Sequence, residues 1–230
     1  MIISLNASPF DLMKSDARMA HAVSRVHESE LPLVYVNMVG GQDELVYDGA
    51  SFALNADGKL AAHLPSFSET TSVIRVGEDF GVPSLTGQMT PPDDGMGALY
   101  RGLTLGLRDY IDKNDFPGVV LGLSGGIDSA IVAALAVDAL GAERVHAVMM
   151  PSPYTSQESL DDAADLAGRL GIRLDEISIA PAMQAMGDMM APQFDGTSAD
   201  ITEENIQSRL RGLILICLLY TSDAADDCEG

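Results

Sequence analysis

The sequence predicts an α/β protein whose second half is built on a doubly wound parallel sheet. An apolar run at residues 119–123 lacks the alternation of a half-exposed strand, and two further strands are expected at residues 145–150 and 172–179, the last of which alternates less cleanly. Runs of this kind are typical of strands that are buried on both faces. Helical patterns lie between them, and successive strand–helix–strand units form parallel sheets with right-handed crossovers.

The composition allows a sizeable core and argues against nucleic acid as a partner. Of the 230 residues, 47% are hydrophobic and 20% are charged, which suits one large or two small domains. The formal net charge is −21, whereas phosphate backbones need clustered Lys and Arg. The two cysteines, Cys217 and Cys228, give no disulfide framework. We find no secretory leader pattern and no apolar run long enough to span a bilayer, so a cytoplasmic location is expected.

The first part of the chain predicts an α/β unit of its own. The turn sequence at residues 55–58 (NADG) between two apolar runs indicates a hairpin. Apolar residues at helical spacing follow the first strand. In order, the expected elements are a strand, a helix, a strand, a loop and a hairpin, at residues 2–5, 12–30, 31–37, 40–43 and 44–60.

A boundary is predicted at residues 64–92, where Ser, Thr, Gly and Pro become frequent and the periodicity lapses. Part of this linker is expected to be strand. Residues 96–114 then show one apolar face of an amphipathic helix, which we expect to pack on the sheet that starts at Val119. The predicted organisation is a first domain, a linker, a second domain and a tail, at residues 1–75, 76–95, 96–216 and 217–230.

The turn after residues 119–123 predicts a phosphate-binding loop. Two consecutive glycines, Gly125 and Gly126, let backbone N–H groups converge, and the helix that begins near Ile127 favours an anion at its N-terminus. Asp128 would repel phosphate unless a divalent cation also binds, so Mg²⁺ is expected there. The plain alternative is that the glycines form only a strand-to-helix turn.

The segments that follow continue the parallel sheet. A helix at residues 127–140 is almost entirely apolar and ends at Gly141. Residues 151–156 follow a strand directly, at the sheet edge where ligands bind in open parallel folds. Thr155 and Glu158 fit a capping box for the next helix.

Two sets of motifs resemble known families. Residues 124–129 (SGGIDS) resemble the pyrophosphate loop of ATP pyrophosphatases, which adenylate a carboxyl or carbonyl oxygen. Residues 6–10 (NASPF), 31–37 and 40–51 (GGQDELVYDGAS) resemble the C-terminal part of a nitrilase-type glutaminase domain. In this order the two resemble the glutamine-dependent NAD synthetases. The implied fold is the C-terminal part of a nitrilase-like α/β sandwich, followed by the first half of a doubly wound, adenine nucleotide α hydrolase-like domain.

This resemblance implies a reaction and a set of ligands. The intact enzyme would use ATP and Mg²⁺ to amidate deamido-NAD to NAD through an adenylated intermediate, with ammonia from glutamine, and it would be a homo-oligomer. The implied deamido-NAD contacts are Asn205 and Arg209, and the implied glutamine contacts are Ser8 and Lys14. Asp128 is the implied metal ligand. The implied ATP-binding residues are Gly122, Leu123, Ser124, Gly125, Gly126, Ile127, Asp128 and Ser129.

Other interpretations of the same residues stay open. Lys14 could be a solvated lysine at a helix start, and Asn205 and Arg209 could belong to a solvated helix face. The enzyme could be another ATP-pyrophosphatase amidotransferase, such as a GMP synthetase-like protein, or the chain an inert nucleotide-binding truncation product.

The resemblance also predicts an incomplete protein. The glutaminase nucleophile of the family is a cysteine with Glu and Lys partners, and all three are expected upstream of Met1, because no cysteine precedes Cys217. The family pattern is expected to stop after Ile216, with residues 217–230 a non-native tail that has no place in the fold. The chain is therefore expected to be a fragment truncated at both ends and inactive as it stands.

Overall fold

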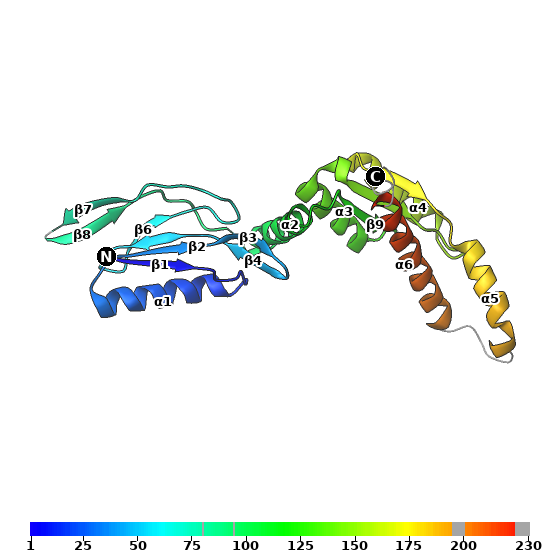
Figure 1. Ribbon diagram of the computed structural model, residues 1–230, viewed down its shortest axis with the longest axis horizontal. Coiled ribbons are helices and arrows are strands. Elements are labelled where there is room, and N and C mark those ends of the chain that lie inside the picture. The colour runs from blue at the N-terminus through cyan, green and yellow to red at the C-terminus, as the bar shows by residue number, and fades with distance from the viewer. Residues whose placement is uncertain (80, 94, 195–200, 224–230) are drawn as a thin grey trace, which may run out of the picture. The chain divides into compact units, whose positions relative to one another are not determined.

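The computed structural model describes residues 1–79, 81–93, 95–194 and 201–223 (Figure 1). The chain divides into two compact units, Met1–Asp115 and Phe116–Gly230. The division lies just after helix α2 (Gly95–Lys113), which the sequence assigns to the start of the second domain. The domain boundaries predicted from the sequence stay predictions.

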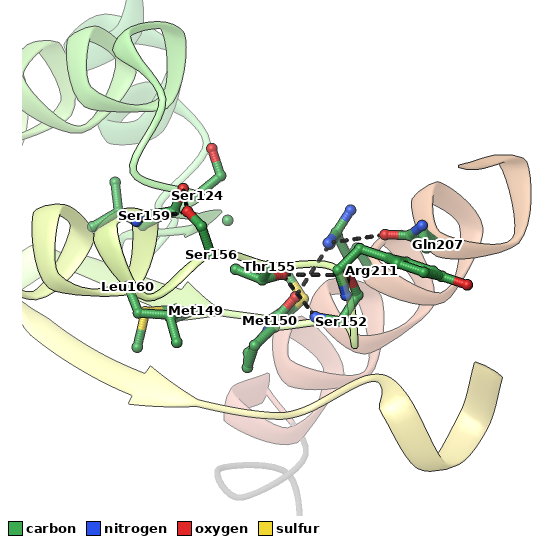
Figure 2. A pocket seen from close by; sticks show the side chains of 14 residues that line it. Ser124, Met149, Met150, Ser152, Thr155, Ser156, Ser159, Leu160, Gln207 and Arg211 are labelled. Atoms are coloured by element: carbon green, nitrogen blue, oxygen red, sulfur yellow. Dashed lines mark hydrogen bonds between the residues drawn. The ribbon is translucent and has the colours of Figure 1, made fainter. Parts of the chain in front are cut away.

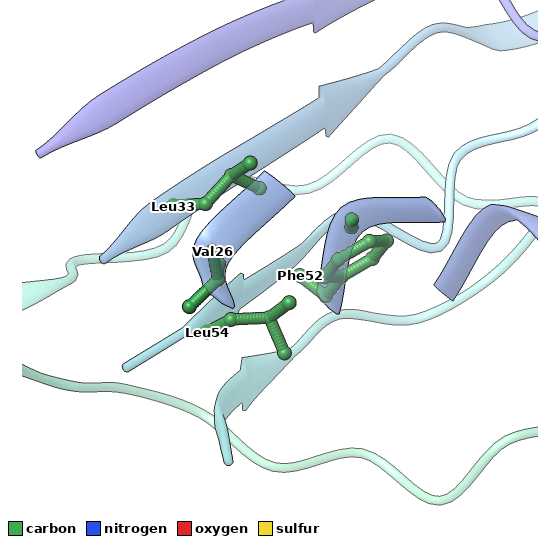
Figure 3. Packing of buried hydrophobic residues seen from close by; sticks show 5 residues of the cluster. Val26, Leu33, Phe52 and Leu54 are labelled. Atoms are coloured by element: carbon green, nitrogen blue, oxygen red, sulfur yellow. The ribbon is translucent and has the colours of Figure 1, made fainter. Parts of the chain in front are cut away.

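The first unit is built on a mixed four-stranded sheet. Its first two strands are parallel and the other pairs are antiparallel. Helix α1 (Lys14–Ser29) packs Val26 against Leu33, Phe52 and Leu54, and these apolar side chains form the core on that face (Figure 3). The strands predicted at residues 2–5 and 31–37, the helix and the hairpin are confirmed. In sheet order the strands are β1 (Ile2–Asn6), β2 (Leu33–Asn37), β5 (Phe52–Leu54) and β6 (Leu60–His63).

The segment predicted as a loop at residues 40–43 is instead largely strand. Strands β3 (Val39–Gln42) and β4 (Leu45–Asp48) form an antiparallel hairpin, and helix α2 (Gly95–Lys113) packs on it. A Cβ atom on Gly41 would lie 3.1 Å from the Cα of Gly106, so the glycine lets the helix approach closely. The glycines that suggested a loop at residues 40–43 therefore allow the close contact between β3 and α2. This hairpin is the partner of α2 in the first unit, whereas the sequence predicted that the helix would pack on the sheet that starts at Val119.

The segment predicted as a linker is partly strand, as expected. Strands β7 (Arg75–Asp79) and β8 (Val82–Thr86) form an antiparallel hairpin. Leu85 is fully buried and packs with alanines of the sheet, and its backbone exchanges two hydrogen bonds with the side chain of Asn55, at 2.7 and 3.2 Å. This segment therefore contributes to the core of the first unit.

The second unit contains the predicted parallel sheet. Strand β10 lies between β9 and β11, and both pairs are parallel. Val148 and Ile179 are fully buried in a cluster that also takes in Leu210 and Ile214 of the last helix. The strands are β9 (Val119–Gly122), β10 (Val145–Met149) and β11 (Arg173–Glu176). The helices are α3 (Ile127–Leu140), the 3₁₀ turn η1 (Ala142–Arg144), α4 (Gln157–Leu170), α5 (Ala180–Phe194) and α6 (Ile201–Asp223).

The predicted capping box of α4 is wrong by one residue. Ser156 is the N-cap, and its Oγ accepts a hydrogen bond from the backbone N of Ser159 at 3.2 Å. The hydroxyl of Thr155 instead accepts from the backbone N of Ser152 at 2.9 Å. Both hydroxyl residues suit a cap in sequence, and the path of the preceding turn decides which one reaches the helix.

We expect Ser156→Ala to lower the free energy of unfolding of the second unit by about 1 kcal/mol, because one orphan N–H group of α4 loses its acceptor. Urea denaturation followed by circular dichroism measures this change. Ser208→Ala on exposed α6 surface is the matched control and should be neutral or slightly stabilising. A Ser156→Ala protein as stable as the parent would contradict the assigned cap.

Helix α6 continues beyond the point where the family pattern was expected to stop. It runs to Asp223, and Leu218 packs against the buried cluster of Val148, Met150 and Ile179. The expectation that nothing after Ile216 has a place in the fold is therefore wrong at Leu218. The rest of that expectation, for residues 224–230, lies outside the described residues. Within the described parts of the chain, no helix is long and apolar enough to cross a membrane.

Candidate nucleotide-binding site

The turn between β9 and α3 has the geometry of an anion-binding loop. Gly126 is the N-cap of α3, and it offers no side chain to the first-turn N–H groups, which have no intrahelical partner. The Oγ of Ser129 donates to the carbonyl of Gly126 at 2.9 Å and accepts from the backbone N of Ser124 at 3.2 Å. The two serine hydroxyls lie 3.1 Å apart. These bonds hold the loop closed around the start of the helix.

The two glycines of the loop have different reasons to be glycine. Gly125 has φ +79°, and a Cβ atom there would lie 2.3 Å from the carbonyl oxygen of Ser159 on α4. Any side chain at this position would therefore meet backbone. Gly126 has φ −80°. A Cβ atom there would lie 3.4 Å from its nearest neighbour, the Oγ of Ser124, which is an ordinary contact. The packing of the chain leaves room for a side chain at Gly126.

A cavity of about 450 Å³ opens beside this loop, within the size range of small-molecule sites (Figure 2). It lies at the carboxyl ends of β9 and β10, where ligands bind in open parallel sheets. Met149 and Met150 are buried and give it an apolar wall, while serine and threonine hydroxyls line another part. The lining residues are Gly122, Leu123, Ser124, Met149, Met150, Pro151, Ser152, Tyr154, Thr155, Ser156, Ser159, Leu160, Gln207 and Arg211.

The structure brings part of the predicted ATP-binding set to this cavity. Gly122, Leu123 and Ser124 line it, whereas the residues from Gly125 to Ser129 follow in the loop and the first turn of α3. Asp128 is exposed in that first turn. Among the described residues, no group of three or more His, Cys, Asp or Glu side chains could hold a metal ion. Asp128 is thus a single carboxylate at this site, without a preformed cluster around it.

Helix α6 reaches the cavity through two residues that are not among the predicted ligand contacts. Gln207 and Arg211 line it, and the Nε of Arg211 donates to the carbonyl oxygen of Met150 at 3.3 Å (Figure 2). Asn205 and Arg209, the predicted deamido-NAD contacts, are exposed on the same helix and do not line the cavity. Both pairs are spaced i, i+4, so the spacing identifies two faces of α6 without deciding between them.

The predicted glutamine contacts share a second cavity, of about 340 Å³, in the first unit. Ser8 and Lys14 both line it, together with Arg18, His21 and other residues of α1, β1 and β2. The structure therefore brings the two residues together, although six positions separate them in sequence. No cysteine is among the residues that line this cavity.

A buried polar network lies behind Ser8 and was not predicted. The side-chain amide of Asn37 clamps both backbone groups of Ser8, accepting from its N at 2.9 Å and donating to its O at 3.2 Å. The same amide donates to Asp48, whose carboxylate accepts two hydrogen bonds from the guanidinium of Arg18, each at 3.0 Å. Asn37 and Asp48 are each 6% exposed. This network fixes the backbone that presents Ser8 to the cavity.

The second unit combines a parallel sheet, a glycine turn that opens a helix, and a cavity at the carboxyl edge of the strands, a combination typical of mononucleotide-binding α/β proteins. A family model described as NAD synthase matches residues 99–224, and the chain belongs to this family. The match begins within α2 and extends past Ile216, to the end of the described part of α6.

Relatives with known names resemble nearly the whole chain. It is 51% identical over 216 residues to the glutamine-dependent NAD(+) synthetase of Rhodobacter capsulatus, covering 93% of this chain and 39% of the relative. It is 40% identical over 220 residues to the enzyme of the same name from Acinetobacter baylyi, covering 94% and 40%. The chain spans about two fifths of the length of these relatives.

A solved structure shows the same architecture. The glutamine-dependent NAD+ synthetase from Acinetobacter baumannii in complex with adenosine diphosphate superposes with a TM-score of 0.89 at 41% sequence identity. The match covers 96% of this chain and 42% of that one. The α/β class with a parallel sheet is thereby confirmed.

Proposed function

We propose that this chain is the ATP-binding part of a glutamine-dependent NAD synthetase, together with the end of its glutaminase domain. The intact enzyme amidates deamido-NAD to NAD, using ATP and ammonia released from glutamine. One observation carries this proposal, namely the glycine loop and cavity at the carboxyl edge of the parallel sheet in a chain of the NAD synthase family. The ADP complex of a relative that is 41% identical supports it.

The finer fold belongs to the same proposal. Residues 1–75 correspond to the C-terminal part of a nitrilase-like sandwich, residues 76–95 join the domains, and residues 96–216 belong to an adenine nucleotide α hydrolase-like domain. The motifs at residues 6–10 and 40–51 support this division. The intact enzyme would be a cytoplasmic homo-oligomer.

The loop chemistry suits the transfer of an adenylyl group. A carboxylate is a poor electrophile until one oxygen becomes a good leaving group, and AMP supplies that group while pyrophosphate departs. The unpartnered N–H groups at the start of α3 and the hydroxyls of Ser124 and Ser129 would bind the pyrophosphate. Because they are fixed before the reaction, they stabilise its developing charge without reorganisation.

A magnesium ion fits this loop through Asp128. Mg²⁺ is commonly bound by one or two carboxylates together with substrate phosphates and water. Asp128 is exposed in the first turn of α3, so its carboxylate can share a cation with phosphates held by the loop. When bound, the ion would neutralise the charge of the departing pyrophosphate. Without it, the carboxylate would repel the phosphates.

The remaining substrates are assigned to residues outside the first cavity. Asn205 and Arg209 present an amide and a guanidinium on one face of α6, where they would contact deamido-NAD. Ser8 and Lys14 would bind glutamine in the cavity of the first unit, with the ammonium of Lys14 on the α-carboxylate. Because no cysteine lines that cavity, we expect glutamine to bind there without being hydrolysed.

Calorimetric titration with ATP in the presence and absence of Mg²⁺ tests the proposal. The chain should bind Mg-ATP, and Gly126→Ala should weaken binding by about tenfold, because a methyl group would stand among the N–H groups that receive phosphate. The melting temperature should fall only slightly, since the new methyl meets only an ordinary contact and the remaining cost is that alanine is a poorer N-cap than glycine. Gly168→Ala, on a part of α4 with open space around it, is the matched control. Absence of Mg-ATP binding by the parent chain would refute the proposed function.

A further inference from the structure

The cavity of the second unit has two chemically different ends. Figure 2 shows Ser124, Ser156 and Ser159 on one side of the site and Gln207 and Arg211 on the other. The first side holds the glycine loop and the start of α4, where backbone N–H groups favour phosphate. A nucleotide whose phosphates bound at this side would extend its base toward α6.

The lining beside α6 matches the surface of a nucleobase. A base has two apolar faces and a polar edge. Met150, whose carbonyl oxygen accepts from Arg211, is buried on this side and its flexible side chain can adapt to a flat ring, whereas Met149 and Leu160 lie on the serine side of the cavity (Figure 2). The amide of Gln207 and the guanidinium of Arg211 supply the polar groups for an edge.

We propose that Gln207 reads the edge of the base and that Arg211 positions it, so that this pair sets the selectivity for adenine over guanine. This inference rests on the proposed function of the cavity as a nucleotide site. An amide offers a donor and an acceptor side by side, and it pairs with the N6 donor and the adjacent ring acceptor of adenine. Guanine presents two acceptors, O6 and N7, on the corresponding edge, and one of them would oppose the amide oxygen.

Arg211 can fix the orientation of that amide. One terminal nitrogen of its guanidinium donates to the Oε1 of Gln207 at 3.5 Å, while its Nε donates to the carbonyl oxygen of Met150 at 3.3 Å. The arginine thus connects α6 to the end of β10 and turns the amide oxygen of Gln207 toward itself. The Nε2 donors and one lone pair of the oxygen then remain for a ligand.

The charge around Arg211 agrees with this role. The chain carries 34 acidic residues, yet within the described parts of the chain no carboxylate lies within ion-pair distance of Arg211. A carboxylate there would compete with Gln207 for the guanidinium donors. The guanidinium of Arg211 therefore donates to two neutral acceptors, the carbonyl oxygen of Met150 and the amide oxygen of Gln207, and these two bonds fix its orientation.

The test compares the dissociation constants of Mg-ATP, Mg-GTP and inorganic pyrophosphate for the chain and its variants. The parent should prefer ATP to GTP by about five- to tenfold, the lower range for one amide–base pair. Gln207→Met keeps the length of the side chain and removes both hydrogen bonds, so this preference should fall to about one while pyrophosphate binding is unchanged. Gln184→Met, on the exposed face of α5, is the matched control.

Arg211→Lys separates positioning from charge. Lysine keeps the positive charge but lacks the planar fork that contacts both Met150 and Gln207, so the ATP preference should also fall. If Gln207→Met and Arg211→Lys weaken ATP and GTP equally, or if the parent does not discriminate between them, the inference is overturned while the nucleotide site stands. If the parent binds neither ATP nor pyrophosphate, the proposed function fails and the inference fails with it.

Discussion

Asp48→Ala is expected to lower the free energy of unfolding of the first unit by about 3–5 kcal/mol, the cost of breaking a buried ion pair by removing one partner. The side chains of Arg18 and Asp48 are 7% and 8% exposed, and two hydrogen bonds of 3.0 Å join them. Removing the carboxylate leaves a guanidinium buried without its counter-charge. It also removes an acceptor from the amide of Asn37.

The exposed pair Arg25–Glu28 is the matched control for this prediction. Its side chains are 70% and 60% exposed, so Glu28→Ala should change stability by less than about 1 kcal/mol. Urea denaturation of the two variants and the parent measures both effects. A loss at Asp48 no larger than the loss at Glu28 would show that the Arg18 pair is not buried in solution.

Replacing the whole buried pair should cost less than breaking it. The double variant Arg18→Met with Asp48→Leu leaves no isolated charge, and apolar replacements of buried ion pairs are often neutral or stabilising. The amide of Asn37 would still lose one acceptor, although its two bonds to the backbone of Ser8 remain. Stability should therefore recover toward that of the parent in the double variant.

The sequence predicted secondary structure well where the pattern of apolar residues lies within the element that it predicts. Buried parallel strands lack alternation, and this signal located β9 within one or two residues. The apolar spacing of α1 and the turn at residues 55–58 are likewise contained in short windows. In each case one stretch of chain carries both the signal and the structure that it forms.

The errors occur where a distant segment decides the outcome. Gly40 and Gly41 suggested a loop, yet they extend a strand because α2, more than 50 residues later, packs against it. Their glycine identity reflects the close approach of Gly106 and Asp109, and not a break in the strand. Periodicity within residues 40–43 contains no information about that helix.

The site shows the same limit. The loop of Ser124 and Gly126 is local and was predicted, whereas its cavity is completed by α6. The sequence of α6 contains two i, i+4 pairs, and a rotation of the helix decides which one faces the cavity. The network of Arg18 and Asp48 joins residues 30 positions apart, and no spacing rule connects them.

The second large effect is expected from Gly125→Val, which should unfold or strongly destabilise the second unit and abolish Mg-ATP binding. From the sequence, the reason for this glycine was access for phosphate. The structure adds a stronger one, because a Cβ atom would lie 2.3 Å from the backbone oxygen of Ser159. The residue also has φ +79°, which costs an L-residue about 1–2 kcal/mol before any clash, and a β-branched residue more.

Comparison of the two glycines separates packing from ligand binding. Gly125→Val should lower the free energy of unfolding by at least about 2 kcal/mol, because α4 has to move away from the loop. Gly126→Ala should lower the free energy of unfolding by no more than about 1 kcal/mol, the difference between a glycine and an alanine N-cap, and should weaken Mg-ATP binding. Thermal unfolding by circular dichroism and calorimetric titration of the same samples measure the two effects. Equal stability of the Gly125→Val protein and the parent would show that the loop does not rest on Ser159, and the distinction between the two glycines would then be wrong.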